Sequence, residues 1–178
     1  MLESKLAHIK LMIFDVDGVL TEPQVIHCGD ALEMKIFNAH DGFGITMARQ
    51  AGFKIAILTG RISPPAEKRA KELKVDFYEA GHFHKKQALL DIQKKAGVTQ
   101  EETLYMGDDI LDLVCAPLVG IFVAPQDANV RVREAATWVT EINGGKGCVR
   151  EVIDEVLNAH SKLTETEDYF ISGGEKNI

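Results

Sequence analysis

The stretch that decides the fold is Ile9-Lys10-Leu11-Met12-Ile13-Phe14-Asp15-Val16-Asp17-Gly18-Val19, in which a short apolar run ends in two carboxylates. Such a run is typical of a buried strand, and Asp and Gly are typical of the turn that follows one. Gly18 gives this turn the backbone freedom to bring Asp15 and Asp17 to one side. One carboxylate can attack phosphorus, and the other can protonate the leaving oxygen and later activate water. The stretch therefore indicates metal-assisted phosphoryl transfer.

The composition restricts the class of protein. A chain of 178 residues with 46% apolar residues suits one domain with a full hydrophobic core, which we expect over residues 1–160. Residues 161–178 are polar and predict a flexible C-terminal tail. The formal charge of −7 disfavours a nucleic acid or an anionic membrane as a partner. The first apolar run is too short for a signal peptide, and no stretch approaches a membrane span.

The three cysteines, Cys28, Cys115 and Cys148, lie far apart and lack C-x-x-C spacing. They fit neither a disulfide framework nor a zinc site. We expect them to be buried packing residues of a protein in the reducing cytoplasm.

Short β-branched or aromatic runs alternate with helical patterns along the chain. The runs that predict strands cover residues 9–14, 54–58, 75–78, 103–106, 118–123 and 137–139. The helical patterns cover residues 42–51, 65–73, 84–96, 109–115, 127–136 and 148–160. This alternation predicts an α/β fold with a doubly wound, mostly parallel, Rossmann-like sheet and helices on both faces.

Residues 23–37 break this rhythm. Two apolar runs there flank Cys28-Gly29-Asp30, which predicts a β-hairpin insertion. Only about 20 residues lie between Thr21 and Asp41, too few for an inserted cap domain. Because a lone hairpin is marginal unless it packs on something, we expect hairpins from several subunits to pack together and to cover a neighbour's site. The alternative is a hairpin that folds back on its own domain.

Polar groups also follow two other predicted strands. Thr59-Gly60-Arg61 offers a hydroxyl, backbone N–H groups and a guanidinium to phosphate oxygens. Gly107-Asp108-Asp109, with Asp112 one turn later, supplies carboxylates that suit Mg²⁺ together with Asp15. Since ligands bind beyond the carboxyl ends of the strands in such a sheet, these groups are expected to meet. Asp109 and Asp112 can equally be capping residues or outer-sphere partners of the metal.

Three further features have two interpretations each. Either Lys85 or Lys86 can place an ammonium on the phosphate. His82 and His84 suggest a transition metal, but carboxylates already suffice for a metal site. Gly144-Gly145-Lys146-Gly147 resembles an anion-binding nest, and it is also consistent with a plain connecting loop.

The order of Asp15-x-Asp17, Thr59-Gly60-Arg61, Lys85 and Gly107-Asp108-Asp109 resembles the four-motif signature of the haloacid dehalogenase (HAD)-type phosphatases. From about Lys10 to His160 the chain is similar to the family of 3-deoxy-D-manno-octulosonate 8-phosphate (Kdo-8-phosphate) phosphatases. The stretches that carry this similarity are Asp15-Val16-Asp17-Gly18-Val19-Leu20-Thr21, Phe37-Asn38-Ala39-His40-Asp41-Gly42-Phe43-Gly44-Ile45, Thr59-Gly60-Arg61-Ile62-Ser63 and Gly144-Gly145-Lys146-Gly147-Cys148-Val149-Arg150-Glu151.

The resemblance implies a HAD-like fold, Mg²⁺ as cofactor and a role for each motif residue. Asp15 would be the nucleophile and a metal ligand, and Asp17 the general acid/base whose backbone carbonyl also binds Mg²⁺. Thr59 and Lys85 would bind the phosphoryl group, and Asp108 would complete the metal site. The residues that would bind a small acidic sugar phosphate are Asn38, Asp41, Gly42, Gly60, Arg61 and Arg69.

The implied activity is the hydrolysis of Kdo-8-phosphate in lipopolysaccharide precursor synthesis, by a homotetramer. The chain departs from the family pattern at Glu22-Pro23, where Asp-Gly is common, and at His40, where Arg is common. One alternative is a phosphatase for the 9-phosphates of nonulosonic acids such as KDN, although Arg61 favours Kdo-8-phosphate. Another is a non-catalytic subunit that uses the fold for assembly, which the intact acidic residues argue against.

Overall fold

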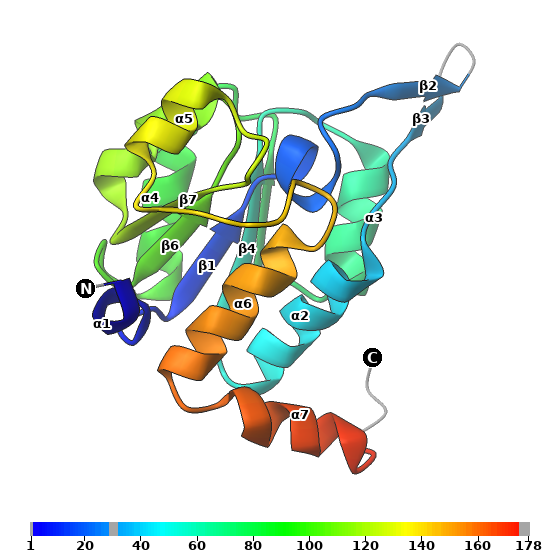
Figure 1. The fold of residues 1–178 in the computed structure, drawn as a ribbon. Coiled ribbons are helices and arrows are strands. Elements are labelled where there is room, and N and C mark those ends of the chain that lie inside the picture. Colours follow the sequence, from blue (N-terminus) through cyan, green and yellow to red (C-terminus); the bar gives the residue numbers. More distant parts are fainter. Residues whose placement is uncertain (1, 29–31, 175–178) are drawn as a thin grey trace.

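The computed structural model describes residues 2–28 and 32–174, and its centre is a six-stranded sheet (Figure 1). The strands are β1 (Leu11–Phe14), β4 (Lys54–Thr59), β5 (Phe77–Ala80), β6 (Thr103–Met106), β7 (Ile121–Ala124) and β8 (Trp138–Val139). They lie in the order β5-β4-β1-β6-β7-β8, and every neighbouring pair is parallel. The doubly wound parallel sheet expected from the sequence is confirmed.

Strand β1 shows why the sequence forms a buried strand. Successive side chains of a strand point to opposite faces of the sheet. Met12 and Phe14 belong to one hydrophobic core, Leu11 and Ile13 belong to the other, and all four are fully buried. A strand covered on both faces reads as a continuous apolar run rather than an alternating one.

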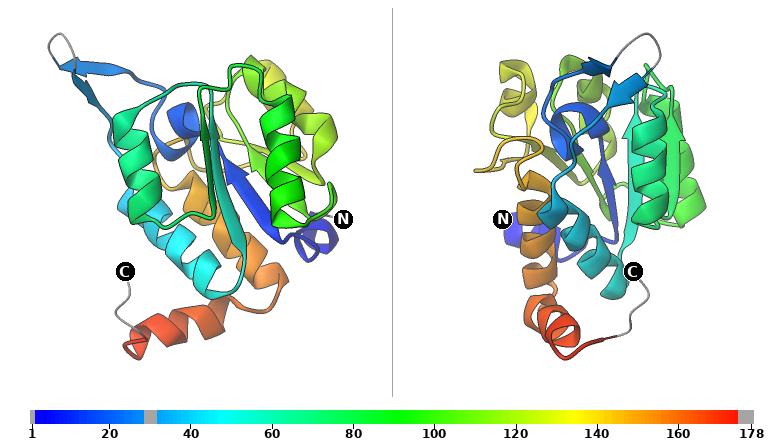
Figure 2. Two further views of the ribbon diagram at one scale, coloured as in Figure 1. Left: turned by 180° about the vertical axis from the view of Figure 1, so that it is seen from behind. Right: turned by 90° about the vertical axis from the view of Figure 1, so that its right-hand side faces the viewer.

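Helices form a layer on each face of the sheet (Figure 2). The helices in the described residues are α1 (Leu2–Leu6), α2 (Ala39–Gln50), α3 (Pro64–Glu72), α4 (Lys86–Ala96), α5 (Val130–Ala135), α6 (Cys148–Ala159) and α7 (Leu163–Ile171), of which α7 packs on α2 and α6. Residues of α2 and α6 pack on the face that Met12 and Phe14 form, and residues of α4 and α5 pack on the opposite face. No helix in the described part of the chain is both long and apolar enough to cross a membrane.

The expected β-hairpin insertion is present as β2 (Ile26–Cys28) and β3 (Leu32–Met34), which pair antiparallel. It projects beyond the end of the sheet at which β1 finishes (Figure 1). The expected turn residues Gly29 and Asp30 lie outside the described residues. Between β1 and β4 the described residues form only η1, this hairpin and α2, which agrees with the expected lack of a cap domain.

Helix α7 corrects the expectation of a flexible tail, which is wrong for residues 163–171. Phe170 meets Phe43 of α2 edge to face, with 5.1 Å between the ring centroids. Leu163 also packs against the core, and Lys162 donates a hydrogen bond to the backbone oxygen of Ala51 at 2.7 Å. The segment is polar overall, so its composition did not indicate that Leu163 and Phe170 pack against the rest of the chain.

Two of the three cysteines are described with their side chains, and they behave as expected. Cys115 and Cys148 are buried free thiols that pack in the two cores. Burial raises the pKa of Cys115 to about 12 and also raises the pKa of Cys148. Both thiols therefore stay protonated at neutral pH.

Candidate active site

The carboxyl ends of three strands meet at one edge of the sheet because β4 and β6 are the two neighbours of β1. Asp15 follows β1, Thr59 ends β4, and Asp108 follows β6. The structure thus brings together three motifs that lie far apart in the sequence. Open α/β sheets bind their ligands at this edge.

Asp15 begins the irregular helical turn η1 (Val16–Leu20). Its Oδ1 accepts a hydrogen bond from the backbone N–H of Val16 at 2.6 Å, which helps to orient the carboxylate. Gly18 in this turn has a φ of 80°, in the region that favours glycine. A Cβ at this position would clash with the carboxylate of Asp108. Gly18 therefore permits both the turn and the close approach of a carboxylate from the neighbouring strand.

Lys85, and not Lys86, reaches the site. Its Nζ donates hydrogen bonds to Oδ2 of Asp15 at 2.6 Å, to Oδ1 of Asp112 at 2.6 Å and to the hydroxyl of Tyr105 at 3.0 Å. Burial opposes its charge, but the two carboxylates outweigh this effect and raise the pKa of Lys85 to about 12. Lys86 is exposed on the first turn of α4. A charged ammonium is therefore held beside Asp15.

Asp112 is a buried anchor of the site. Its Oδ1 also accepts a hydrogen bond from the Tyr105 hydroxyl at 2.5 Å. Its Oδ2 accepts hydrogen bonds from the backbone N–H groups of Asp108 at 3.0 Å and Asp109 at 3.1 Å, which completes a capping box at the start of η2 (Ile110–Val114). Asp109 itself is an exposed helix cap. In this structure Asp112 orients Lys85 and the Asp108 backbone, and Asp109 caps η2.

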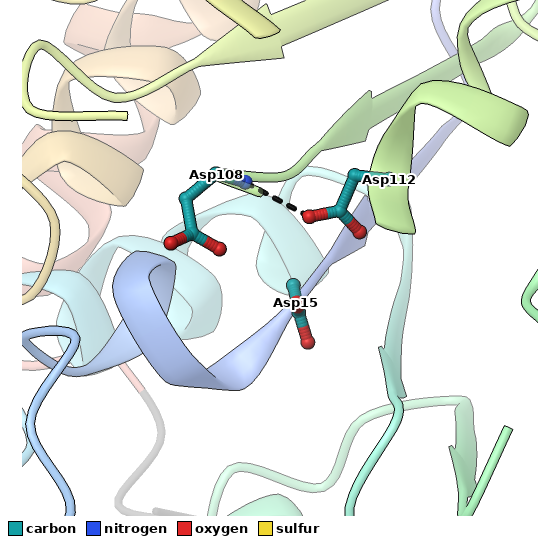
Figure 3. Close-up of side chains that lie close together, drawn as sticks. All are labelled: Asp15, Asp108 and Asp112. Carbon is teal, nitrogen blue, oxygen red and sulfur yellow. Dashed lines mark hydrogen bonds between the residues drawn. The ribbon is translucent and has the colours of Figure 1, made fainter. Parts of the chain in front are cut away.

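The carboxylates of Asp15, Asp108 and Asp112 offer oxygens that all lie within 4.8 Å of one another (Figure 3). Burial, together with Asp112 and Asp15, raises the pKa of Asp108 to about 8. Burial also raises the pKa of Asp15 to about 6, although Lys85 counteracts this shift. Both pKa values are raised partly because neighbouring carboxylates repel one another, which a bound cation would relieve, and hard oxygen ligands are what Mg²⁺ prefers. The donor set therefore fits a Mg²⁺ ion.

Asp108 and Asp112 differ in how many hydrogen bonds their carboxylates accept. Four hydrogen bonds engage the oxygens of Asp112. No hydrogen bond from the described residues engages the carboxylate of Asp108. Asp108 is therefore the freer of the two to bind a cation. No such cluster among the described residues contains a histidine, and His82 pairs instead with Glu79 at 3.4 Å.

The turn after β4 lies at the same edge. Thr59 is 1% exposed, and its Oγ1 accepts a hydrogen bond from the backbone N–H of Arg61 at 3.4 Å. A Cβ at Gly60 would approach no atom more closely than the backbone oxygen of His82, at 3.8 Å. A hydroxyl and backbone N–H groups therefore stand at the sheet edge, as a phosphate-binding turn requires.

Asp17 lies outside the three-carboxylate cluster. Its carboxylate forms an ion pair with Lys35, which follows β3 of the hairpin. Nζ of Lys35 also lies 3.2 Å from Oε1 of Glu33, and the same oxygen lies 3.3 Å from Nη2 of Arg61. A row of alternating charges thus runs from Asp17 through the hairpin to Arg61, whose side chain is 44% exposed.

Three residues expected to bind substrate lie on or beside α2 and α3. Asn38 caps α2, and its Oδ1 accepts a hydrogen bond from the backbone N–H of His40 at 2.8 Å. Arg69 lies over the ring of Phe37, with 5.9 Å from its Cζ to the ring centroid. Gly42 leaves room for this guanidinium, because a Cβ there would clash with Arg69.

Asp41, which the sequence predicts to bind substrate, lies buried between α2 and α6. It is 1% exposed, and its Oδ1 accepts a hydrogen bond from the backbone N–H of Arg150 at 2.8 Å, in the first turn of α6. Burial raises the pKa of Asp41 to about 6, although hydrogen bonds from the backbone of Arg150, Gly147 and Val149 counteract the shift. The carboxylate therefore holds α6 against α2.

The loop Gly144-Gly145-Lys146-Gly147 is a connection that supports η1. The backbone N–H of Gly145 donates to the oxygen of Val19 at 2.8 Å, and that of Gly144 donates to Oδ1 of Asp127 at 2.8 Å. A Cβ at Gly144 would clash with the backbone oxygen of Gly18. Because these N–H groups already have partners, the loop is a brace for the turn that carries Asp17 rather than an anion nest.

Sequence reasoning did not identify three polar residues of the site. Tyr105 lies in the apolar run of β6, where a buried hydroxyl needs a partner, and this need was the available signal. Lys35 and Glu33 lie in the hairpin. No pattern in the sequence indicates that the stem of the hairpin folds back over η1.

Comparisons with known proteins agree with this geometry. A family model described as haloacid dehalogenase-like hydrolase matches residues 79–153. The 3-deoxy-D-manno-octulosonate 8-phosphate phosphatase of Haemophilus influenzae is 39% identical over 161 residues, which are 90% of this chain and 89% of that protein. The corresponding phosphatase of Escherichia coli K12 is 37% identical over 164 residues, 92% of this chain and 87% of that protein.

Two solved structures share the whole fold. The phosphatase of this name from Moraxella catarrhalis, in complex with magnesium, phosphate and Kdo, superposes with a TM-score of 0.91 at 34% identity, over 94% of this chain and 97% of that one. The cobalt-bound enzyme from Haemophilus influenzae superposes with a TM-score of 0.90 at 38% identity, over 94% and 99%. The chain therefore belongs to the Kdo-8-phosphate phosphatase family of haloacid dehalogenase-like hydrolases.

Proposed function

We propose that the protein is a Mg²⁺-dependent phosphomonoesterase that hydrolyses Kdo-8-phosphate to Kdo and phosphate. The observation that carries this proposal is the Lys85 ammonium, held 2.6 Å from Asp15 beside a cluster of three carboxylates. This arrangement supplies a nucleophile, a cation for phosphoryl oxygens and oxygen ligands for Mg²⁺. The names of the relatives, which match nearly the whole chain, support the choice of substrate.

In the first step, a carboxylate oxygen of Asp15 attacks phosphorus and the bond from phosphorus to the sugar oxygen breaks. The sugar oxygen leaves with the electron pair and takes a proton from the carboxyl group of Asp17. Lys85 and Thr59 donate hydrogen bonds to the equatorial oxygens while charge develops on them. Kdo leaves, and the phosphoryl group stays on Asp15.

In the second step, water attacks the same phosphorus atom, and the Asp17 carboxylate takes the proton of that water. The bond between phosphorus and Asp15 breaks, which releases phosphate and restores both carboxyl groups to their starting states. Asp15, Asp108 and the backbone carbonyl of Asp17 would hold Mg²⁺, which when bound supplies positive charge to the phosphoryl oxygens.

Arg61 favours Kdo-8-phosphate over the alternative sugar. Its side chain is half exposed beside the hairpin and presents a planar cationic fork to the carboxylate of the sugar acid. Phosphatases for KDN-9-phosphate can carry Glu at this position. Arg69, Asn38 and Gly42 would form another part of the sugar site.

The hairpin is the candidate for covering the site in a homotetramer. Three of its apolar side chains are well exposed in one chain: Val25 at 44%, Met34 at 50% and Ile36 at 66%. Burying this surface against a neighbouring subunit would be favourable and would exclude water from the substrate. Phe37, by contrast, packs against the core of its own chain. The subunit contacts should therefore involve Ile36 rather than Phe37.

We propose that the protein works in the cytoplasm, in the synthesis of lipopolysaccharide precursors. Buried free thiols and a net charge of −7 are consistent with this setting. The acidic surface is unsuited to nucleic acids and anionic membranes as partners.

The test is a screen of phosphate release over sugar phosphates, with and without Mg²⁺. We expect Kdo-8-phosphate to have the highest kcat/KM, and we expect chelation of Mg²⁺ to abolish turnover. A higher kcat/KM for KDN-9-phosphate would overturn the substrate, and turnover that survives exhaustive chelation would overturn the metal. Absence of phosphate release from every compound would favour the non-catalytic assembly subunit.

A further inference from the structure

The side chain of Lys35 is 2% exposed, the same fraction as the side chain of Lys85. Its ammonium forms ion pairs with Asp17 and with Glu33. Among the described residues, Lys35 alone bonds to the carboxylate of Asp17. The orientation of that carboxylate therefore depends on one side chain from the hairpin.

A buried ammonium is costly unless it is paired, so Lys35 and its two carboxylates hold one another in place. Asp17 lies in an irregular turn with φ −71° and ψ 124°, and its side chain is 25% exposed. Without Lys35, nothing described in the structure would fix its χ1 rotamer. The carboxyl group would then sample several directions, most of them unsuited to proton transfer.

We propose that Lys35 is a positioning residue that orients Asp17 for proton transfer, with Glu33 as its brace. This inference rests on the proposed function, in which Asp17 is the general acid. A general acid must lie within about 3 Å of the oxygen that it protonates, and a misplacement of about 1 Å can cost about 100-fold in rate. Because Lys35 belongs to the stem of the hairpin, the element that would cover the site also orients its acid.

The leaving group separates this role from a general effect on the site. A sugar alkoxide needs a proton from Asp17 as it leaves, whereas 4-nitrophenolate is a stable anion that leaves without one. Formation of the phosphoryl enzyme from Kdo-8-phosphate should therefore depend on Lys35, and its formation from 4-nitrophenyl phosphate should not. The second step also uses Asp17, so the first turnover has to be measured separately from steady-state turnover.

The experiment compares Lys35→Met with the wild-type protein in single turnovers, with enzyme and Mg²⁺ in excess. We expect the rate of Kdo formation to fall about 10- to 100-fold and the rate of 4-nitrophenolate formation to change less than about threefold. Lys35→Arg, which keeps the charge, should recover most of the lost rate. The matched control is Lys71→Met, which removes an exposed lysine from an ion pair with Glu67 on α3 and should change neither rate.

Three results would overturn the inference: equal falls for both substrates, an increase in KM for Kdo-8-phosphate without a change in the single-turnover rate, or no effect at all. If Lys35→Met does not fold, Glu33→Gln removes the brace and keeps the ammonium, and it should show a smaller fall with the same dependence on the leaving group. The wild-type protein tests the underlying assignment in the same experiment. If it releases no Kdo, the proposed function fails; if it does and the variants match it, only the role of Lys35 fails.

Discussion

Nζ of Lys85 lies 2.6 Å from Oδ2 of Asp15, although 70 residues separate the two in the sequence. With the pKa of Asp15 at about 6, this carboxylate is ionised at neutral pH, as a nucleophile must be. The Lys85 ammonium is positioned to bind a phosphoryl oxygen as Asp15 attacks.

Removing the Lys85 ammonium should therefore cost activity. We predict that Lys85→Met lowers kcat/KM for Kdo-8-phosphate by at least about 100-fold, the loss that follows removal of one donor to a developing oxyanion. The control is Lys86→Met, which should retain nearly full activity because Lys86 is exposed. Steady-state phosphate release measures both variants. A greater loss for Lys86→Met would show that the wrong lysine has been assigned.

The Asp108 carboxylate should be a principal Mg²⁺ ligand, because it belongs to the cluster and accepts no hydrogen bond from the described residues. Asp108→Asn should weaken Mg²⁺ binding by more than about 10- to 100-fold, the range produced by losing even an outer-sphere partner of a metal. Isothermal titration calorimetry measures the affinity. Asp109→Asn is the control and should bind Mg²⁺ normally, since Asp109 caps η2. Equal affinities for the wild-type protein and the Asp108 variant would remove Asp108 from the metal site.

Asp41 should make the stability depend on pH. Its folded-state pKa of about 6 exceeds the ordinary value of 3.8, so the folded protein holds this proton more tightly than the unfolded chain does. The free energy of unfolding should therefore fall as pH rises from about 4 to about 6, by at most about 3 kcal/mol from this group.

Asp41→Asn carries no titratable proton and can keep the hydrogen bond from Arg150. Urea unfolding at a series of pH values should show the wild-type protein losing stability relative to this variant between about pH 4 and 6, and running parallel above about pH 7. Parallel curves over the whole range would show that the carboxyl group of Asp41 titrates normally.

The brace behind η1 should be sensitive to a single methyl group. A Cβ at Gly144 would clash with the backbone oxygen of Gly18, so Gly144→Ala should displace the turn that carries Asp17. We expect kcat to fall by about tenfold or more. Gly52→Ala is a control, because Gly52 has a φ of 91° and a Cβ added there would meet no atom within 4 Å. It should lower stability through backbone strain and leave kcat unchanged, whereas full activity in Gly144→Ala would mean that the loop does not support the site.

The fold could be predicted where one physical cause acts on a whole segment. Strand β1 is buried on both faces, so its sequence is uniformly apolar, and the alternation with helices implies parallel neighbours. Boundaries depend on single contacts and are less predictable. Strand β5 begins at Phe77 instead of residue 75. The backbone N–H of Ile55, on the neighbouring strand, donates its hydrogen bond to the side chain of Asp76 and not to a backbone oxygen of β5.

The site could be predicted where its residues lie at the ends of predicted elements. Asp15, Thr59, Lys85 and Asp108 all do, and the parallel sheet brings those ends together. Lys35 and Asp41 acquire their places only through tertiary packing, the first because the hairpin stem lies over η1 and the second because α2 packs on α6. Nothing local in the sequence distinguishes such residues from ordinary surface charges.

The claim that Asp15 is the nucleophile is tested by locating the phosphoryl group on the enzyme. The protein with Mg²⁺ would be mixed with Kdo-8-phosphate, quenched in acid within one turnover and treated with borohydride, which converts a phosphorylated aspartate to homoserine. Peptide mass spectrometry then locates the homoserine. We predict homoserine at position 15 and at no other position, and none in Asp15→Asn. Homoserine at another position, or full turnover by Asp15→Asn, would contradict it.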